Sequence, residues 1–198
     1  MTVKLSVLFL LLASPLAAQL PAGWSARPDK GDASGVKFAA MGPGFHVNAG
    51  QAAVLYRDED KVGSKFHTVV TYAQTKAPTH PEGYGLVFGG TDLAGPGQKY
   101  TYFLIRGDGM YSVKTRSGDA TPTVVVPWTA SDAIQKADST GKTTNQIEID
   151  AAGAKVVFKV NGKTVYTMET ADRAGIVGLR TNHGLDLHIS GFAVHKIG

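Results

Sequence analysis

The chain has 198 residues, of which 43% are hydrophobic and 18% are charged. This balance excludes an intrinsically disordered chain, which would be poorer in apolar residues, and a protein of many membrane-spanning segments, which would be much richer. Twenty basic and sixteen acidic residues give a net charge of only +4, and the basic residues are scattered along the chain. Because nucleic-acid-binding domains usually concentrate their basic residues in a stripe, nucleic acid is not expected as a partner.

The first 18 residues have the pattern of a secretory signal peptide. A short start that ends in Lys4 precedes an apolar run at residues 5–12, and Ser14-Pro15 separates this run from the small residues before Gln19. The apolar run is shorter than the ~20 residues that span a bilayer, and no later run approaches that length. We therefore expect cleavage after Ala18 and an exported protein, periplasmic or secreted, without a membrane span.

The chain contains no cysteine, so its core must be stable without disulfides. About 180 residues are enough for this, because a domain of that size buries about 70% of its unfolded surface. The lack of thiols also excludes thiol catalysis and zinc–thiolate sites, and the six histidines show no His-x-x-x-His pair. We expect no metal site and no cofactor. A structural calcium ion bound by the loop residues Asp92, Asp108 and Asp119 remains an alternative. Their spacing, however, is not that of a calcium-binding loop.

From residue 36 to the C-terminus, short runs of β-branched and aromatic residues recur every eight to twelve positions between turn residues. This spacing is typical of an antiparallel β-sandwich or barrel, and the Asn161-Gly162 pair favours a type I′ hairpin turn. A Pro- and Gly-rich lead at residues 19–35 is expected to precede this sandwich domain (36–198). Ser131-Asp132 is expected to cap a turn or two of helix over residues 131–136. The thirteen expected strands are 36–40, 45–47, 52–56, 66–74, 84–89, 100–106, 110–115, 123–127, 146–151, 155–160, 163–169, 175–181 and 185–196.

The strand at residues 84–89 alternates in an uneven way. Its even-numbered residues are bulky (Tyr84, Leu86 and Phe88), whereas glycine or valine stands between them. One face of this strand is therefore nearly bare, which favours a flat concave surface over it.

Several short stretches, taken in chain order, resemble one family. They are YGLVF (84–88), YTYFLI (100–105), GDGMY (107–111), VPWT (126–129), NQIEI (145–149), VVFKVNGK (156–163), AGIVGL (174–179) and ISGFAV (189–194). In this order they are similar to small exported bacterial modules of the concanavalin A-like lectin/glucanase superfamily. The resemblance implies an all-β fold, a two-sheet antiparallel β-sandwich of the jelly-roll type, in agreement with the strand pattern.

The glucanases of this superfamily use the motif Glu-x-Asp-x-x-Glu, because a retaining mechanism needs two carboxyl groups about 5 Å apart on one strand face. Glu148-Ile149-Asp150 matches the first half of the motif, but residues 151–154 read Ala-Ala-Gly-Ala. The third carboxylate is missing, so we expect Glu148 and Asp150 to face solvent and assign no catalytic residue. No Gly-x-Ser-x-Gly elbow of a serine hydrolase occurs either.

Sugar rings have apolar faces, so glycan-binding sites combine aromatic side chains with polar groups that bind hydroxyls. Strand alternation predicts that Tyr100, Tyr102 and Arg106 share one face. The competing interpretation is that the tyrosines belong to the core and that the tryptophan of VPWT covers one end of the sandwich. The candidate ligand-binding residues are Tyr100, Tyr102, Arg106, Tyr111, Trp128, Asn182 and His183.

We therefore expect an exported, non-catalytic sandwich that binds a glycan or small saccharide. One alternative is an enzyme acting on a modified sugar, related to 3-keto-glycoside hydrolases, although residues 84–90 replace the Asn-Ser-Gly-Ile-type strand of those modules. Another is a structural or interaction module that pairs through a sheet edge. The sequence does not define the oligomeric state.

Overall fold

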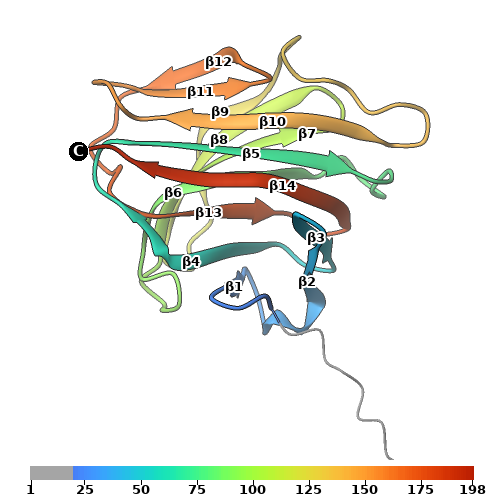
Figure 1. Ribbon diagram of the computed structural model, residues 1–198, viewed down its shortest axis with the longest axis horizontal. Helices are drawn as coiled ribbons and strands as arrows, with labels where there is room; N and C mark the ends of the chain where they lie inside the picture. Colours follow the sequence, from blue (N-terminus) through green and yellow to red (C-terminus); the bar gives the residue numbers. More distant parts are fainter. Residues whose placement is uncertain (1–19) are drawn as a thin grey trace, which may run out of the picture.

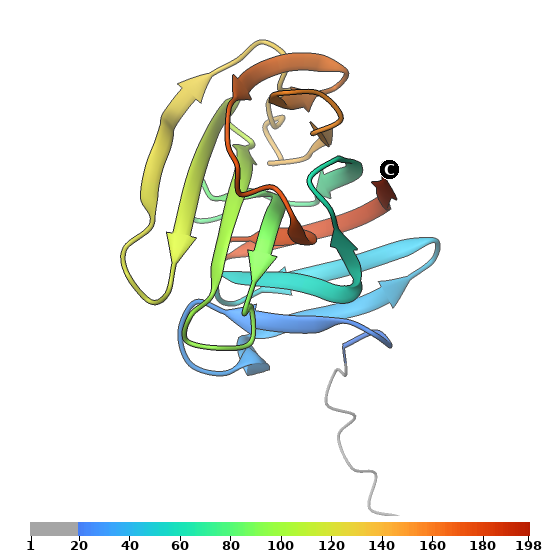
Figure 2. The ribbon, with the colours of Figure 1, turned by 90° about the vertical axis from the view of Figure 1, so that its left-hand side faces the viewer.

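The computed structural model describes residues 20–198, which form two antiparallel seven-stranded sheets facing each other (Figures 1 and 2). We call them sheet A, in the order β1-β4-β13-β6-β7-β8-β9, and sheet B, in the order β12-β11-β10-β5-β14-β3-β2. The expected two-sheet antiparallel sandwich is confirmed. The export signal expected at residues 1–18 lies outside the described residues.

All thirteen expected strands are present, with ends that differ by a few residues. Sheet A contains β1 (Ser25–Pro28), β4 (Ala53–Val62), β13 (Gly175–Thr181), β6 (Gly83–Thr91), β7 (Lys99–Arg106), β8 (Met110–Ser117) and β9 (Thr123–Ala130). Sheet B contains β12 (Lys163–Met168), β11 (Val156–Val160), β10 (Thr143–Asp150), β5 (Phe66–Gln74), β14 (Leu185–Lys196), β3 (Gly44–Ala49) and β2 (Val36–Met41). The lead segment is not separate from the sandwich, because it contributes β1, which pairs with β4 at the edge of sheet A.

The core between the sheets follows from the period-two alternation of the strands. On β10, Ile147 and Ile149 are fully buried, whereas Gln146 and Glu148, which alternate with them, face outward. The Phe158 ring from sheet B lies with its centroid 5.1 Å from that of Phe103 and 6.1 Å from that of Phe88, both in sheet A. Aromatic contacts of this kind hold the two sheets together without disulfides.

The expected hairpin turn at Asn161-Gly162 is confirmed, with φ angles of +50° and +76°. The expected helix at residues 131–136 is wrong. A single turn forms there, and the side chains of two asparagines bind its backbone groups: Asn145 Oδ1 accepts from Gln135 N at 2.8 Å, and Asn161 Nδ2 donates to Ala133 O at 2.9 Å. Partners from sheet B thus replace the internal hydrogen bonds of a helix.

The only helix in residues 20–198 is one 3₁₀ turn, η1 (Ala33–Gly35). No helix among these residues has the length and apolar character needed to cross a bilayer.

Candidate functional site

A second apolar cluster lies on the side of sheet A that faces away from sheet B, which we call the outer face of sheet A. It is separate from the core between the sheets. The outer face of an antiparallel sheet is commonly polar, because it is in contact with water. An outer face rich in apolar and aromatic residues therefore suggests a binding surface. Its buried members are Val54, Tyr56, Val87, Leu93, Tyr100, Tyr102 and Leu104, with Trp128 and Ile176 packed against them.

Trp128 lies across this face. It stands on β9, yet its Cη2 atom is 2.9 Å from the position that a Cβ atom would take on Gly83 of β6. The sheet order places β8 and β7 between these strands, and three strand spacings of about 4.8 Å exceed the reach of an indole in a flat sheet. Sheet A therefore curves toward its outer face, and the bare strand that the sequence predicted lies beneath the tip of the tryptophan.

Two cations lie against the indole. The guanidinium carbon of Arg106 is 4.3 Å from the ring centroid of Trp128, and the ammonium of Lys114 is 5.7 Å from it. Both distances are in the range of cation–π attraction. Arg106 also forms an ion pair with Asp108 in the turn that follows β7. Sequence analysis selected Arg106 and Trp128 separately, and the structure brings them into contact.

Tyr100 and Tyr102 lie on this face as predicted, with ring centroids 5.5 Å apart. They are 3% and 4% exposed, so they form its floor rather than an open platform. This burial supports the competing interpretation in part, because the tyrosines are packed, although outside the core between the sheets. Burial raises the pKa of the Tyr102 hydroxyl to about 12, against the opposing charge of Arg180.

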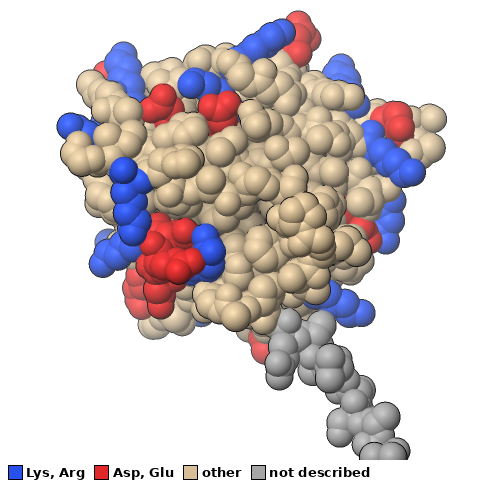
Figure 3. Space-filling view, in the orientation of Figure 1, with Lys and Arg blue, Asp and Glu red and all other residues tan. Residues whose placement is uncertain are grey.

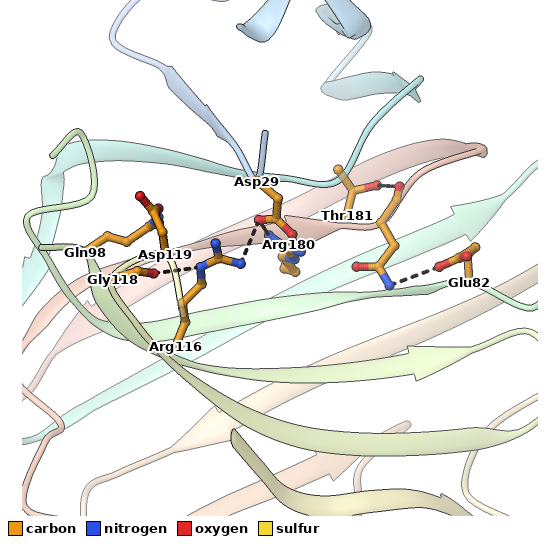
Figure 4. Close-up of polar contacts among 9 residues, drawn as sticks. Asp29, Glu82, Gln98, Arg116, Gly118, Asp119, Arg180 and Thr181 are labelled. Carbon is orange, nitrogen blue, oxygen red and sulfur yellow. Dashed lines mark hydrogen bonds and ion pairs between the residues drawn. The ribbon is translucent and has the colours of Figure 1, made fainter. Parts of the chain in front are cut away.

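Arg180 is the central polar residue of the floor, and sequence analysis did not select it. It stands on β13, is only 4% exposed, and places its guanidinium carbon 5.4 Å from the Tyr102 ring centroid. Its Nη1 and Nη2 atoms donate to the two carboxylate oxygens of Asp29 at 2.7 and 2.6 Å (Figure 4). Arg116 of β8 approaches the same carboxylate, at 3.7 Å. The sequence did contain a signal for this residue. Arg180 follows the apolar run GIVGL, and an arginine in a buried strand needs a counter-ion.

The charge of Asp29 is stabilised by these arginines. Burial alone would raise the pKa of its carboxyl group, but hydrogen bonding to Arg180, together with the charges of Arg180, Arg116 and Arg27, outweighs burial and lowers the pKa. Asp29 is therefore ionised throughout the neutral range. It follows directly on β1, so the lead segment supplies the counter-ion of the outer face.

A depression of about 460 Å³ lies between this segment and β8, lined by Arg27, Asp29, Lys30, Arg116 and Asp119 among others. Three of these residues, Asp29, Arg116 and Asp119, are drawn in Figure 4.

Asn182 and His183 lie at the opposite rim, in the connection between β13 and β14. Asn182 Nδ2 donates to Glu82 Oε2 at 3.1 Å, and His183 Nε2 is 3.2 Å from Glu82 Oε1. The backbone of Asn182 donates to the carbonyl of Gly83, directly beside the tip of Trp128. These two predicted residues therefore border the outer face of sheet A, joined by Glu82.

Tyr111 does not belong to this site. It pairs with Ile105 across β7 and β8, and cross-strand partners share one face. That face is the inner one: Tyr111 is 7% exposed and lies with its ring centroid 6.2 Å from that of Phe103, in the core between the sheets. Its selection as a ligand-binding residue is corrected accordingly.

Glu148 and Asp150 lie on the far side of the sandwich. Their side chains are on the outer face of sheet B, where Glu148 is 3.3 Å from His67 and both carboxylates are within 3.9 Å of Lys159. Figure 3 shows this side of the molecule, with most charged side chains around its margin and a largely uncharged centre. Within residues 20–198, no three His, Asp or Glu side chains gather as a metal site would require.

No family model matches the sequence, and no curated protein matches it. Three solved structures share the architecture. The carbohydrate-binding module CBM66 from Bacillus subtilis is 12% identical, with a TM-score of 0.63 over 88% of this chain and 96% of that one. A Bacillus subtilis protein of unknown function with a galectin-like fold is 11% identical, with a TM-score of 0.63 over 87% of this chain and 89% of that one. A Bacteroides ovatus GH16 protein of a mixed-linkage glucan locus, solved with a G4G4G3G product, is 8% identical, with a TM-score of 0.57 over 86% of this chain and 94% of that one.

The fold is a two-sheet antiparallel jelly roll, which these structures share. At these identities the likeness extends to the fold alone, so the chemistry must be argued from the outer face of sheet A.

Proposed function

We propose that this jelly roll binds a saccharide on the outer face of sheet A. One observation carries the proposal: the indole of Trp128 extends across the curved sheet with Arg106 and Lys114 against its ring. An aromatic surface flanked by hydrogen-bond donors matches a sugar ring, which has an apolar face and a rim of hydroxyls. The structural neighbours, which include the carbohydrate-binding module CBM66, support the same interpretation.

Some residues of the outer face are expected to contact the sugar, and others support the shape of the surface. Trp128 and Lys114 are partly exposed, and the Arg106 side chain is 18% exposed, so these three are the expected sugar contacts. Asn182 and His183 extend the surface at the rim. Tyr100, Tyr102 and Arg180 are buried and fix the shape of the floor.

We propose further that the module binds without catalysis. Three carboxylates of the outer face already have partners: Asp29 and Asp108 form ion pairs with Arg180 and Arg106, and Glu82 contacts Asn182 and His183. Glycoside hydrolysis requires two carboxyl groups that act on one bond. Incubation with a ligand oligosaccharide is expected to release no new reducing ends, and their release would contradict this part of the proposal.

The pattern of residues 1–18 supports export, which N-terminal sequencing of the protein recovered from cells tests directly. A new N-terminus near residue 19 is expected.

Binding is tested by screening the purified protein on a glycan array and measuring each hit by titration calorimetry. Arg106→Gln removes the charge that stacks on Trp128, and Trp128→Ala removes the indole itself. Tyr166→Ala is the matched control, because this partly exposed tyrosine lies on β12 of sheet B. We expect at least a tenfold loss of affinity for the two site variants and none for the control, with thermal unfolding confirming that each variant is folded. Equal affinity in all four proteins would refute the assignment of the face.

A further inference from the structure

Lys114 occupies an unusual position on the outer face of sheet A. It stands opposite Tyr102 in the pairing of β7 and β8, so its side chain shares the face of the tyrosine. Its ammonium lies 5.7 Å from the Trp128 ring centroid, and the residue is partly buried. A buried cation is usually accompanied by a carboxylate that offsets the loss of hydration.

The other cations of the face have such partners, and Lys114 does not. Arg106 pairs with Asp108, whereas Arg116 and Arg180 both pair with Asp29. Within residues 20–198, no carboxylate lies within ion-pair distance of the Lys114 ammonium, and its side chain makes no hydrogen bond there.

The surroundings of Lys114 disfavour a positive charge. Burial lowers the pKa of its ammonium, the charge of Arg180 lowers it further, and Arg106 adds to this, while Glu82 opposes them. Of the charged side chains that act on Lys114, two are the cations Arg180 and Arg106, and only Glu82 is a carboxylate. Glu82 is already held by His183 and Asn182 at the rim. The uncompensated charge is therefore located at Lys114, beside the aromatic surface.

We infer that the saccharide is anionic and that its carboxylate or sulfate group binds to Lys114 while its ring lies against Trp128. This inference rests on the proposed function and specifies its ligand class. An anionic group would supply the counter-charge that the face lacks, whereas a neutral sugar would leave Lys114 uncompensated. Arg106 is near enough to the same indole to donate a second hydrogen bond to the ring substituents.

The test compares matched ligands by titration calorimetry at low salt. Oligogalacturonate is compared with its neutral methyl ester, and a sulfated galacto-oligosaccharide is compared with its unsulfated form. Because a hydrogen bond between charged groups is markedly stronger than a neutral one, we expect the anionic member of at least one pair to bind about tenfold more tightly. The preferred pair distinguishes a carboxylate from a sulfate, and added salt should weaken the preference.

Three variants test whether Lys114 causes the tighter binding of the anionic ligand. Lys114→Gln is expected to abolish the preference for the anionic member, whereas Lys114→Arg should keep it. Lys163→Gln is the control, because this exposed lysine lies on β12 of sheet B, and it should have no effect.

Each of the other outcomes would refute one part of the proposal. Equal binding of neutral and anionic members would refute the anionic ligand and leave the proposed saccharide binding in place. A preference that Lys114→Gln does not change, or that Lys163→Gln reduces as strongly, would show a diffuse charge effect and refute the assignment to Lys114. Failure of every saccharide to bind would refute the proposed function as well.

Discussion

The ion pair between Asp29 and Arg180 provides a sharp test of how the outer face of sheet A is held together. Asp29→Asn keeps the size of the side chain, so it creates no cavity, but it removes the negative charge. Arg180, which is 4% exposed, then remains buried with only a neutral partner in place of a carboxylate that accepted hydrogen bonds at 2.7 and 2.6 Å. Arg116 loses the same counter-ion.

The expected cost follows from the degree of burial. Breaking a fully buried ion pair costs about 3–5 kcal/mol. The Asp29 side chain is 27% exposed, and asparagine still offers one oxygen to Arg180, so the free energy of unfolding should fall by less, about 2–3 kcal/mol. For a chain of this size the melting temperature should drop by roughly 4–12 °C.

Urea unfolding at pH 7, followed by tryptophan fluorescence, measures the difference. Asp119→Asn is the matched control, because this aspartate has a side chain that is 71% exposed and lies 3.6 Å from Arg27. An exposed pair of this kind contributes little, so the control should change stability by less than about 0.5 kcal/mol.

The pH dependence has a definite sign. The pKa of Asp29 is lowered in the folded protein, so its stabilising contribution is complete above the unfolded pKa of about 3.9 and is lost as the pH falls through the lower folded pKa. The difference in stability between the wild-type protein and Asp29→Asn should therefore be constant near neutral pH and shrink in strong acid. Equal effects of Asp29→Asn and Asp119→Asn at pH 7, or a difference that grows in acid, would refute this account.

Three further substitutions test the core, the hairpin and the surface. Phe158→Ala should reduce the free energy of unfolding by about 3–5 kcal/mol, because this fully buried ring joins the two sheets, and a loss below about 1 kcal/mol in urea unfolding would contradict that role. Gly162→Ala should cost roughly 1–2 kcal/mol through its φ of +76° alone, since an added Cβ atom meets nothing within 4 Å. Gly153→Ala, which has similar space and no positive φ, should be close to neutral in the same assay. Gly83→Ala would place a Cβ atom 2.9 Å from Trp128 Cη2, so displacement of the indole should change the near-ultraviolet circular dichroism and weaken saccharide binding. Unchanged affinity after a spectroscopically visible shift would exclude the indole as the contact surface.

Local pattern was enough to predict most of the fold. Period-two alternation, turn residues and the Asn161-Gly162 pair depend only on residues close in the sequence, and all thirteen expected strands formed. The missed strand β1 has the sequence SARP, with no apolar alternation, and ends in proline. Proline is tolerated there because β1 is an edge strand, and only its pairing with β4 reveals it.

The sequence predicted the arrangement of site residues only where those residues belong to the same strand. Alternation placed Tyr100, Tyr102 and Arg106 together, because all three belong to β7. The position of Tyr111 depended on its partner across the hairpin, and the pairing of Asp29 with Arg180 joins residues 151 positions apart. Neither relation follows from the periodicity of one segment.

The curvature of sheet A connects these features. Glycines at positions 83 and 85 leave β6 bare on its outer face, so the indole of Trp128 can extend over Leu104 toward it without a clash. With the indole in this position, Arg106 and Lys114 both lie against its ring, so that two positive charges share one surface. Asp29, which follows β1, pairs with the buried Arg180 and Arg116, whereas Lys114 has no carboxylate partner among residues 20–198.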